Sequence, residues 1–298
     1  MGLKLILNKM DKNKALTGGR VATHSKPIRQ AGKMTSNKGF SLIELVTVLA
    51  ITGIVITGIY TAYIYQQRSY TTQEQVAAMQ QNLRGGLNMM AREIRGAGYT
   101  DPDDTVTAGI LVAAHNSISF TRDNDDPNAT SADTIIYTYD TTDPLKPTLN
   151  RQQTGSVNSN GAVAENIEEL RFAYAFDADG NGDLDRSPNG NVIWAVDSGN
   201  WFNLDTNDDG VIDANDSPSG LAPNTEIIVG TDTLIAVDIN HIRAVKIWLL
   251  ATTPPAHSDN KFASNRIYIA GNQKSTFNDG IRRRLLTTAV KCRNLEFN

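Results

Sequence analysis

The stretch that decides the fold reads Lys38-Gly39-Phe40-Ser41-Leu42-Ile43-Glu44-Leu45-Val46-Thr47-Val48-Leu49-Ala50, and the apolar run that it opens continues to Tyr65. About 26 residues at 1.5 Å each exceed the roughly 30 Å hydrocarbon core of a bilayer, so the run can cross a membrane as a helix. The only charged residue in this apolar run, Phe40 to Tyr65, is Glu44. A carboxylate within a membrane span costs about 2.5 to 3.5 kcal/mol, so Glu44 indicates a function or a partner that offsets this cost.

Charge is divided unevenly along the chain. Of 28 lysine and arginine residues, nine lie in residues 1–39, which hold only one of the 32 acidic residues; 19 basic and 31 acidic residues remain. The basic segment is expected to stay in the cytoplasm by the positive-inside tendency, which places the chain after residue 65 outside it. The acidic remainder argues against broad binding of nucleic acids, because phosphate contacts need clustered Lys and Arg.

The junction between the basic and the apolar segments does not look like an ordinary secretory signal, since no convincing small-x-small site follows the apolar run. It closely resembles the cleavage and methylation site of type IV prepilins. In that family a peptidase on the cytoplasmic side cuts after the glycine and methylates the new N-terminal phenylalanine. The resemblance implies cleavage after Gly39, methylation of Phe40, and an assembly role for Glu44, which would meet the terminal amine of a neighbouring subunit. Met34 offers a start that gives a leader of the usual short length.

The helix is expected to continue beyond the membrane as an amphipathic segment. Apolar residues recur at spacings of three and four, which predicts one apolar face: Val76, Met79, Leu83, Leu87, Met90 and Ile94. No proline interrupts residues 40–101, so a single helix of about 55 residues is predicted. Gly85 and Gly86 weaken this helix, and Gly96 with Gly98 should end it.

The rest of the chain reads mainly as strands separated by Gly, Asn, Asp and Pro clusters. The predicted strands are Ile110–Phe120, Thr134–Tyr139, Leu170–Phe176, Val192–Val196, Ile242–Leu250, Arg266–Ala270 and Leu285–Val290. A long helix followed by strands predicts an α+β, pilin-like fold in which an antiparallel sheet covers the apolar face of the helix. The predicted organisation is a leader (1–39), a membrane or filament-core half of the helix (40–65), an amphipathic half (66–98) and a β-rich exported head (99–298).

A resemblance to PilW-like minor pilins extends along the chain. It is carried by four pieces: Ala91 to Tyr99, Ile167 to Tyr174, Ile242 to Ile247, and Arg282 to Asn294. The resemblance implies a structural subunit with no enzymatic activity, held in the bacterial inner membrane by one span with its head outside the cytoplasm, and located in the pilus after assembly. The implied partners are other major and minor pilins, the prepilin peptidase, the inner-membrane assembly platform and an adhesin at the filament tip.

Two alternatives share parts of this pattern. A J-like minor pseudopilin of type II secretion would have the same processing signal and fold. A calcium-dependent adhesin anchored by one uncut helix would differ from both in keeping its N-terminus. The purpose of the pilus, whether motility, adhesion, DNA uptake or electron transfer, cannot be read from the residues.

Two acidic loops carry the spacing of calcium-binding loops, in which oxygen donors occupy alternate positions and glycine the sixth. The second loop resembles an EF-hand or dockerin loop and offers Asp205, Asn207, Asp209, the Val211 carbonyl, Asp213 and Asp216. The first loop offers Asp177, Asp179, Asn181, Asp183 and Asp185, but Pro188 stands at its twelfth position. Structural Ca²⁺ is therefore predicted in these loops, against the alternative of plain Asp/Asn-Gly turns on an acidic surface.

Few other residues suggest chemistry. The single cysteine, Cys292, excludes an intramolecular disulfide and is expected to be buried. A basic cluster is formed by Arg282, Arg283 and Arg284, with Lys291 and Arg293. It predicts a subunit contact or a solvated strand face, because no interleaved aromatic residues support stacking on nucleic acid. No metalloprotease, nucleophile-elbow or phosphate-loop motif occurs, so no catalytic residue is assigned.

Overall fold

The computed structural model describes residues 39–99, 109–123, 132–155, 158–199, 201–216, 220–222, 226–229, 232–235, 238–254 and 265–295. These fall into two compact units that divide between Tyr60 and Thr61. Residues 1–38 lie outside the described residues, so the predicted leader and the start at Met34 stay predictions.

Helix α1 (Leu42–Arg95) has 54 residues and begins directly after Ser41, whose carbonyl accepts the hydrogen bond of Leu45 N. The single long helix predicted from the unbroken run without proline is confirmed. Every residue of α1 up to Tyr60 is exposed. Within the described ranges, α1 is the one helix long and apolar enough to cross a membrane.

In the second unit, the amphipathic half of α1 buries the predicted apolar face. Met79, Leu83, Leu87, Met90 and Ile94 are all buried, and Val76 packs against them at the margin. The helix ends at Arg95 in a tighter turn, in which Gly96 N donates to the Glu93 carbonyl at 3.0 Å. Gly98 follows with φ +80°. The predicted end of the helix is therefore confirmed.

A five-stranded antiparallel sheet follows, with its strands in the order of the sequence: β1 (Ile110–Ala113), β2 (Ser117–Arg122), β3 (Asp133–Asp140), β4 (Thr148–Thr154) and β5 (Ser159–Glu165). The prediction of one strand over 110–120 is wrong. The chain turns between β1 and β2, where Ala114 N donates to the Ser117 carbonyl at 3.0 Å, and the two halves pair with each other. Strands β4 and β5 were not predicted.

A six-stranded sheet has the order β15-β12-β6-β7-β8-β9. Its members are β6 (Ile167–Phe176), β7 (Trp194–Asp197), β8 (Phe202–Asp205), β9 (Gly220–Leu221), β12 (Ile242–Thr252) and β15 (Arg283–Lys291). Two hairpins, β10 (Glu226–Val229) with β11 (Asp232–Ile235) and β13 (Ile267–Ala270) with β14 (Gln273–Thr276), and two short 3-10 helices, η1 (Ile239–His241) and η3 (Arg293–Leu295), complete the described elements. Strands β3, β6, β7, β12, β13 and β15 confirm predicted strands to within a few residues.

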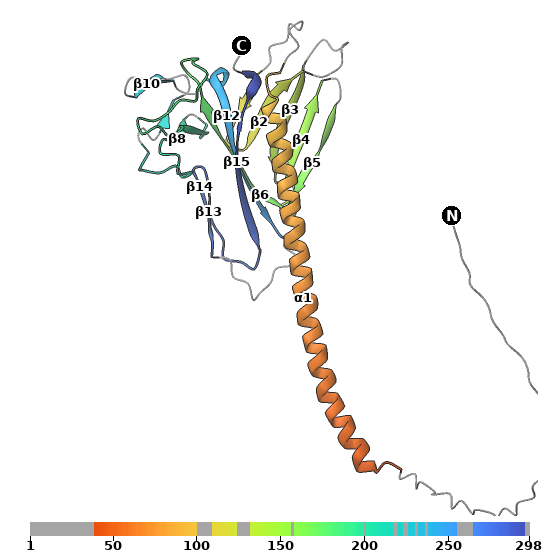
Figure 1. Ribbon diagram of the computed structural model, residues 1–298. Helices are drawn as coiled ribbons and strands as arrows, with labels where there is room; N and C mark the ends of the chain where they lie inside the picture. Colours follow the sequence, from red (N-terminus) through yellow and green to blue (C-terminus); the bar gives the residue numbers. More distant parts are fainter. Residues whose placement is uncertain are drawn as a thin grey trace, which may run out of the picture. The chain divides into compact units, whose positions relative to one another are not determined.

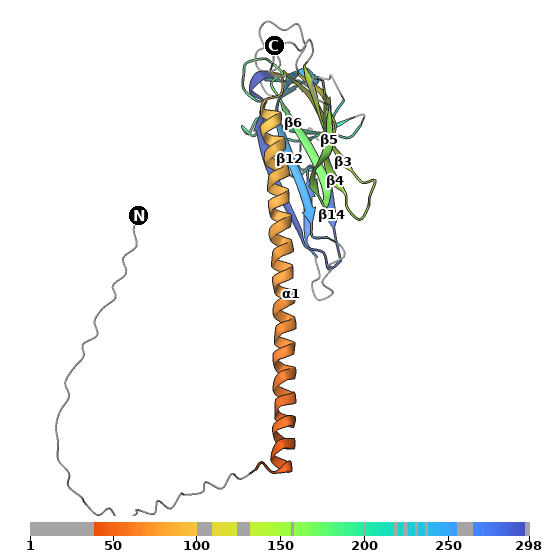
Figure 2. The same cartoon turned by 90° about the vertical axis from the view of Figure 1, so that its right-hand side faces the viewer.

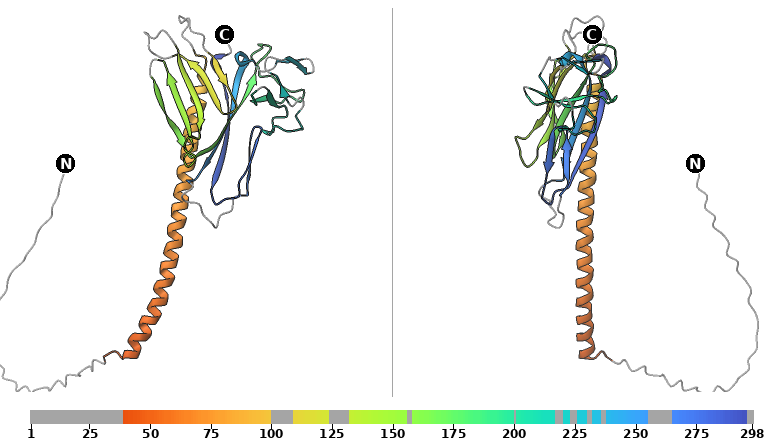
Figure 3. Two further views of the ribbon diagram at one scale, coloured as in Figure 1. Left: turned by 180° about the vertical axis from the view of Figure 1, so that it is seen from behind. Right: turned by 90° about the vertical axis from the view of Figure 1, so that its left-hand side faces the viewer.

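The amphipathic half of α1 lies against both large sheets (Figures 1 and 2). Gly86 marks the closest approach, because a Cβ there would lie 3.0 Å from Ala164 Cβ on β5 and 3.8 Å from Leu249 Cδ2 on β12. Seen from behind, the five-stranded and six-stranded sheets lie side by side (Figure 3). One helix packed on antiparallel sheets is the α+β, pilin-like arrangement that the sequence predicts.

The six-stranded sheet has a second, smaller core on its other face, formed by Ala173, Ala175, Trp194, Val196, Ala244, Trp248 and Ala270. Leu184 and Ile212 pack against this core from the two acidic loops. Each is the eighth residue of its loop. Both loops are thus anchored to the sheet by an apolar side chain at the same position of the loop.

Candidate functional site

The junction residues stand before α1 in open surroundings. Phe40 is 84 % exposed, and a Cβ added at Gly39 would meet no heavy atom within 4 Å. The fold of the described residues therefore has no need of glycine at position 39. A requirement for glycine there would have to come from another molecule.

Glu44 lies in the first turn of α1 and is exposed. The hydroxyl of Thr47 donates to the backbone carbonyl of Glu44 at 2.9 Å, which leaves the carboxylate out of that contact. The apolar residues around Glu44 are exposed as well, including Leu42 and Ile43. The described chain thus presents a carboxylate on an otherwise apolar helical surface.

The second acidic loop begins at the end of β8 and is tied together by its own side chains. Asp205 Oδ2 accepts from Gly210 N at 3.0 Å, and Asp209 Oδ1 accepts from Val211 N at 2.8 Å. Asp216 is buried and accepts twice, from Thr206 N at 2.7 Å and from Asp213 N at 2.9 Å. Asp216, the twelfth residue, thereby joins the second and ninth positions of the loop.

The first acidic loop follows β6 and has nearly the same internal hydrogen bonds. Asp177 Oδ2 accepts from Gly182 N at 3.0 Å, just as Asp205 accepts from Gly210. The two glycines also share a left-handed backbone, with φ of +89° and +80°. In both loops the carboxylate of the first residue is therefore turned inward by the amide of the sixth.

The two loops differ in how they close. Asp185 N donates to the Phe176 carbonyl at 2.8 Å, and Asp185 Oδ1 accepts from Ala178 N at 3.2 Å. Ala178 is the second residue of its loop, so Asp185 holds the position that Asp216 holds in the second loop. The first loop therefore closes after nine residues, and Pro188 at the twelfth position does not leave it open.

The first carboxylate of each loop is almost fully buried. Asp177 is 2 % exposed and Asp205 is 1 % exposed, and the Oδ1 atom of each has no hydrogen-bond partner among the described residues. A basic side chain lies near each carboxylate. Arg243 Nε is 3.9 Å from Asp177 Oδ2, and Lys246 Nζ is 4.0 Å from Asp205 Oδ2. Burial raises the pKa of Asp205. Within the described ranges, no three Asp, Glu, His or Cys side chains converge on one point as they do around a bound metal.

The second loop also contacts a hairpin distant in sequence. Val211 forms a parallel bridge with Gly271, which lies in the turn between β13 and β14. Lys246 on β12 also donates to Asp208 Oδ1 at 2.9 Å. The loop is therefore fixed to the six-stranded sheet and to this hairpin at separate points.

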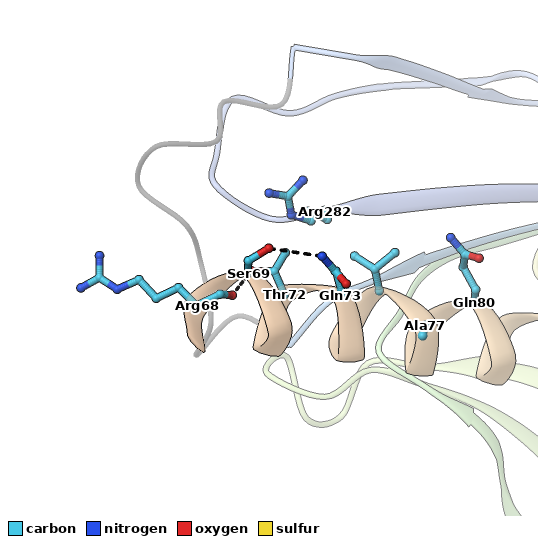
Figure 4. Close-up of a pocket in the computed structure, with 8 residues that line it drawn as sticks. Arg68, Ser69, Thr72, Gln73, Ala77, Gln80 and Arg282 are labelled. Atoms are coloured by element: carbon cyan, nitrogen blue, oxygen red, sulfur yellow. Dashed lines mark hydrogen bonds between the residues drawn. The ribbon is translucent and has the colours of Figure 1, made fainter. Parts of the chain in front are cut away.

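The arginine cluster is divided by the fold. Arg283 is 8 % exposed and pairs with Glu168 and with Asp279. Burial lowers the pKa of its guanidinium, but the hydrogen bonds to these two carboxylates raise the pKa by more and keep the group charged. Arg282 instead lines a cavity of about 550 Å³ whose helical wall includes Ser69 and Gln73, and its guanidinium group points away from the helix (Figure 4). The three arginines thus do not form one continuous basic surface.

Cys292 is fully buried, as predicted, and burial raises the pKa of its thiol to about 12. A thiol of this kind stays protonated at neutral pH and is a poor nucleophile.

A buried polar cluster between α1 and the five-stranded sheet was missed from the sequence. Glu93 accepts from Tyr137 OH at 2.5 Å and from Arg151 Nε at 2.9 Å. Burial and the bond to Glu93 raise the pKa of Tyr137. The available signal was the position of Glu93 on the apolar face of the helix, one turn after Met90.

Comparison with protein families agrees with these features. The family described as Type IV Pilus-assembly protein W (PilW) matches residues 136–294, and the prokaryotic N-terminal methylation motif matches residues 34–60. No curated protein and no solved structure matches the chain. The PilW match spans the six-stranded sheet with β4 and β5, and the motif spans the junction at Gly39 and the exposed half of α1. The chain belongs to the PilW family of type IV pilus assembly proteins.

Proposed function

We propose that this chain is a minor pilin, stored in the bacterial inner membrane as a single-pass prepilin and used to prime a type IV pilus or to form part of its tip. The observation that carries the proposal is the N-terminal junction, where a methylation motif meets an exposed apolar helix. Pilin-family domains point to a structural role, with other pilus components as partners.

The exposed half of α1 supports storage in a membrane followed by burial in a filament. Large apolar side chains such as Phe40, Leu49 and Ile54 are 62 to 84 % exposed. At about 25 cal/mol per Å² of apolar area, such a surface is stable only when lipid or other protein covers it. The prepilin peptidase and the inner-membrane assembly platform would act on the chain in the first state, and neighbouring major and minor pilins, with a tip adhesin, would contact it in the second.

Cleavage after Gly39 is the first step that the proposal requires. Because nothing in the described fold crowds Gly39, a bulkier residue there should leave folding intact and block only the peptidase. We expect Gly39→Leu to accumulate as uncut precursor in the membrane and to be absent from sheared filaments. The measurement is the mass of the intact protein in each fraction.

Gly53 provides the matched control, since a Cβ there also meets nothing within 4 Å and the residue lies in the same exposed helix. Gly53→Leu should be cut normally. A mature protein beginning at Phe40 in the Gly39→Leu variant would show that the assigned site is wrong. An uncut wild-type protein that stays in the membrane would favour an anchored adhesin, and cut protein found only with a secretion system would favour a J-like pseudopilin.

A further inference from the structure

We propose that the head binds two calcium ions, one in each acidic loop, and that the first loop is a complete nine-residue site closed by Asp185. This inference does not depend on which filament the chain joins. It rests on the two buried carboxylates, on the shared loop backbone and on the way each loop closes.

The first observation is the pair of buried oxygens without a partner. Asp177 and Asp205 each give Oδ2 to a loop amide and leave Oδ1 with no hydrogen bond among the described residues. A buried acceptor of this kind is costly, and a carboxylate more so than a neutral group. A hard cation that binds oxygen, one in each loop, would supply the missing partner of each Oδ1 atom.

The second observation is that side-chain oxygens at alternate positions of each loop accept hydrogen bonds from backbone amides two residues further on. In the first loop, Asp179 Oδ1 accepts from Asn181 N at 3.1 Å, and Asn181 Oδ1 accepts from Asp183 N at 2.8 Å. In the second, Asn207 Oδ1 accepts from Asp209 N at 2.9 Å. The backbone of both loops is therefore turned at alternate residues, as it is in calcium-binding loops.

The third observation is the number of oxygen donors. The second loop offers five side chains, from Asp205, Asn207, Asp209, Asp213 and Asp216, and the Val211 carbonyl, which reaches the six to eight ligands that calcium prefers. The first loop offers Asp177, Asp179, Asn181, Asp183 and Asp185, and water would complete its shell. Asp179 and Asp209 are exposed, and their Oδ2 atoms accept from the side-chain amides of Asn181 and Asn207 at 2.7 and 3.1 Å. They can turn toward an ion without disturbing the core when they release these two contacts.

The nearby cations do not replace the ion. Arg243 and Lys246 lie 3.9 and 4.0 Å from their carboxylates, beyond hydrogen-bond distance, and Lys246 is bonded at 2.9 Å to Asp208 instead. Lys291 Nζ also reaches the first loop, where it donates to the Gly182 carbonyl at 3.4 Å. The first loop has four acidic residues and the second has five. In each loop the acidic side chains therefore outnumber these cations.

The test is calorimetric titration of the full chain, purified in detergent and freed of metal by a chelator, with calcium chloride. We expect two ions per chain and a higher melting temperature with calcium. Asp179→Asn and Asp209→Asn change exposed residues only, and each should remove one ion or weaken its binding by about tenfold or more. Asp185→Asn should affect the same ion as Asp179→Asn.

Asp143→Asn is the matched control, because Asp143 is an exposed turn residue that accepts from Leu145 N at 3.0 Å outside both loops. It should leave stoichiometry and affinity unchanged. Titration without heat and without a melting shift would overturn the proposal. A single ion unaffected by Asp179→Asn and Asp185→Asn would overturn the first site alone, and an equal loss in Asp143→Asn would reduce both sites to general attraction of cations by an acidic surface.

Discussion

Gly85 and Gly86 are neighbours in α1 but have opposite surroundings. A Cβ at Gly85 would meet nothing within 4 Å, whereas one at Gly86 would lie 3.0 Å from Ala164 Cβ and 3.4 Å from Leu149 Cδ2. Sequence reasoning treated the two glycines alike, as residues that weaken the helix. The structure shows that Gly86 lets the helix approach the sheets closely, while Gly85 has no such role.

This contrast gives a prediction for two single substitutions. Gly85→Ala should stabilise the protein by up to about 1 kcal/mol, the difference in helix propensity. Gly86→Ala should be less stable than Gly85→Ala by about 1 to 3 kcal/mol. Both substitutions gain helix propensity, but the added methyl group at position 86 would crowd Ala164 and Leu149. Thermal unfolding of the full chain in detergent, followed by circular dichroism, measures both. Equal melting temperatures for the two variants would mean that the helix does not pack on β5 as closely as described.

At the scale of elements, Glu93, Tyr137 and Arg151 join α1 to strands β3 and β4. The side chains of Glu93 and Arg151 are 7 % and 11 % exposed, so their ion pair is largely shielded from water. Removing one partner of a buried pair leaves an uncompensated charge, and this costs far more than the loss of an exposed pair.

Arg151→Met should therefore destabilise the protein by about 3 to 5 kcal/mol, and Tyr137→Phe by about 1.5 to 3 kcal/mol. The exposed pair of Lys146 and Glu165, 51 % and 49 % exposed, provides the control. Lys146→Met should change stability by at most about 1 kcal/mol. Chemical denaturation compares the three variants. If Arg151→Met behaved like Lys146→Met, the buried pair would not hold the helix to the sheet.

The elements differ in how far sequence predicts them. Helix α1 is predictable from its unbroken apolar run, and β12 from its dense β-branched and apolar residues. Strands β4 and β5 read as polar loop segments, and their pairing with β3 and with each other gives them strand structure that local propensity does not indicate. The turn at His115 and Asn116 divides what looked like one strand, because a hairpin without Gly or Pro leaves little signal in the sequence.

At the scale of the whole molecule, the proposed role in assembly depends on Glu44. Its carboxylate is exposed in the first turn of α1, far along the chain from the core of the head. Neutralising it should therefore leave the head folded.

Glu44→Ala is expected to insert, to be cut after Gly39 and to melt like the wild type, yet to enter filaments poorly. Loss of its attraction to the terminal amine of a neighbouring subunit is the physical reason. Immunoblotting of sheared filaments against membranes measures incorporation, with Thr57→Ala in the same helix as control. Normal incorporation of Glu44→Ala beside wild-type partners would contradict the proposed pairing.

The candidate sites were predictable to different extents. The junction at Gly39 is contiguous in sequence, so its motif could be read directly. The second acidic loop could be read from a twelve-residue template. The closure of the first loop could not, because the template assigns the closing role to Pro188 and only the folded loop shows Asp185 bonded to Ala178. The cluster around Glu93 unites three distant segments and has no local signature.

The segment that follows α1 and the segment that follows β15 contact each other. A Cβ at Gly98, just after α1, would lie 2.2 Å from Leu295 Cδ2, and β15 pairs with β12 in the six-stranded sheet. Contacts between such distant residues form only after a large loop closes, which makes folding slow. A chain synthesised from its N-terminus therefore cannot complete this core until the segment around Leu295 is available. An export channel that passes only unfolded polypeptide would therefore receive the head before the head has folded.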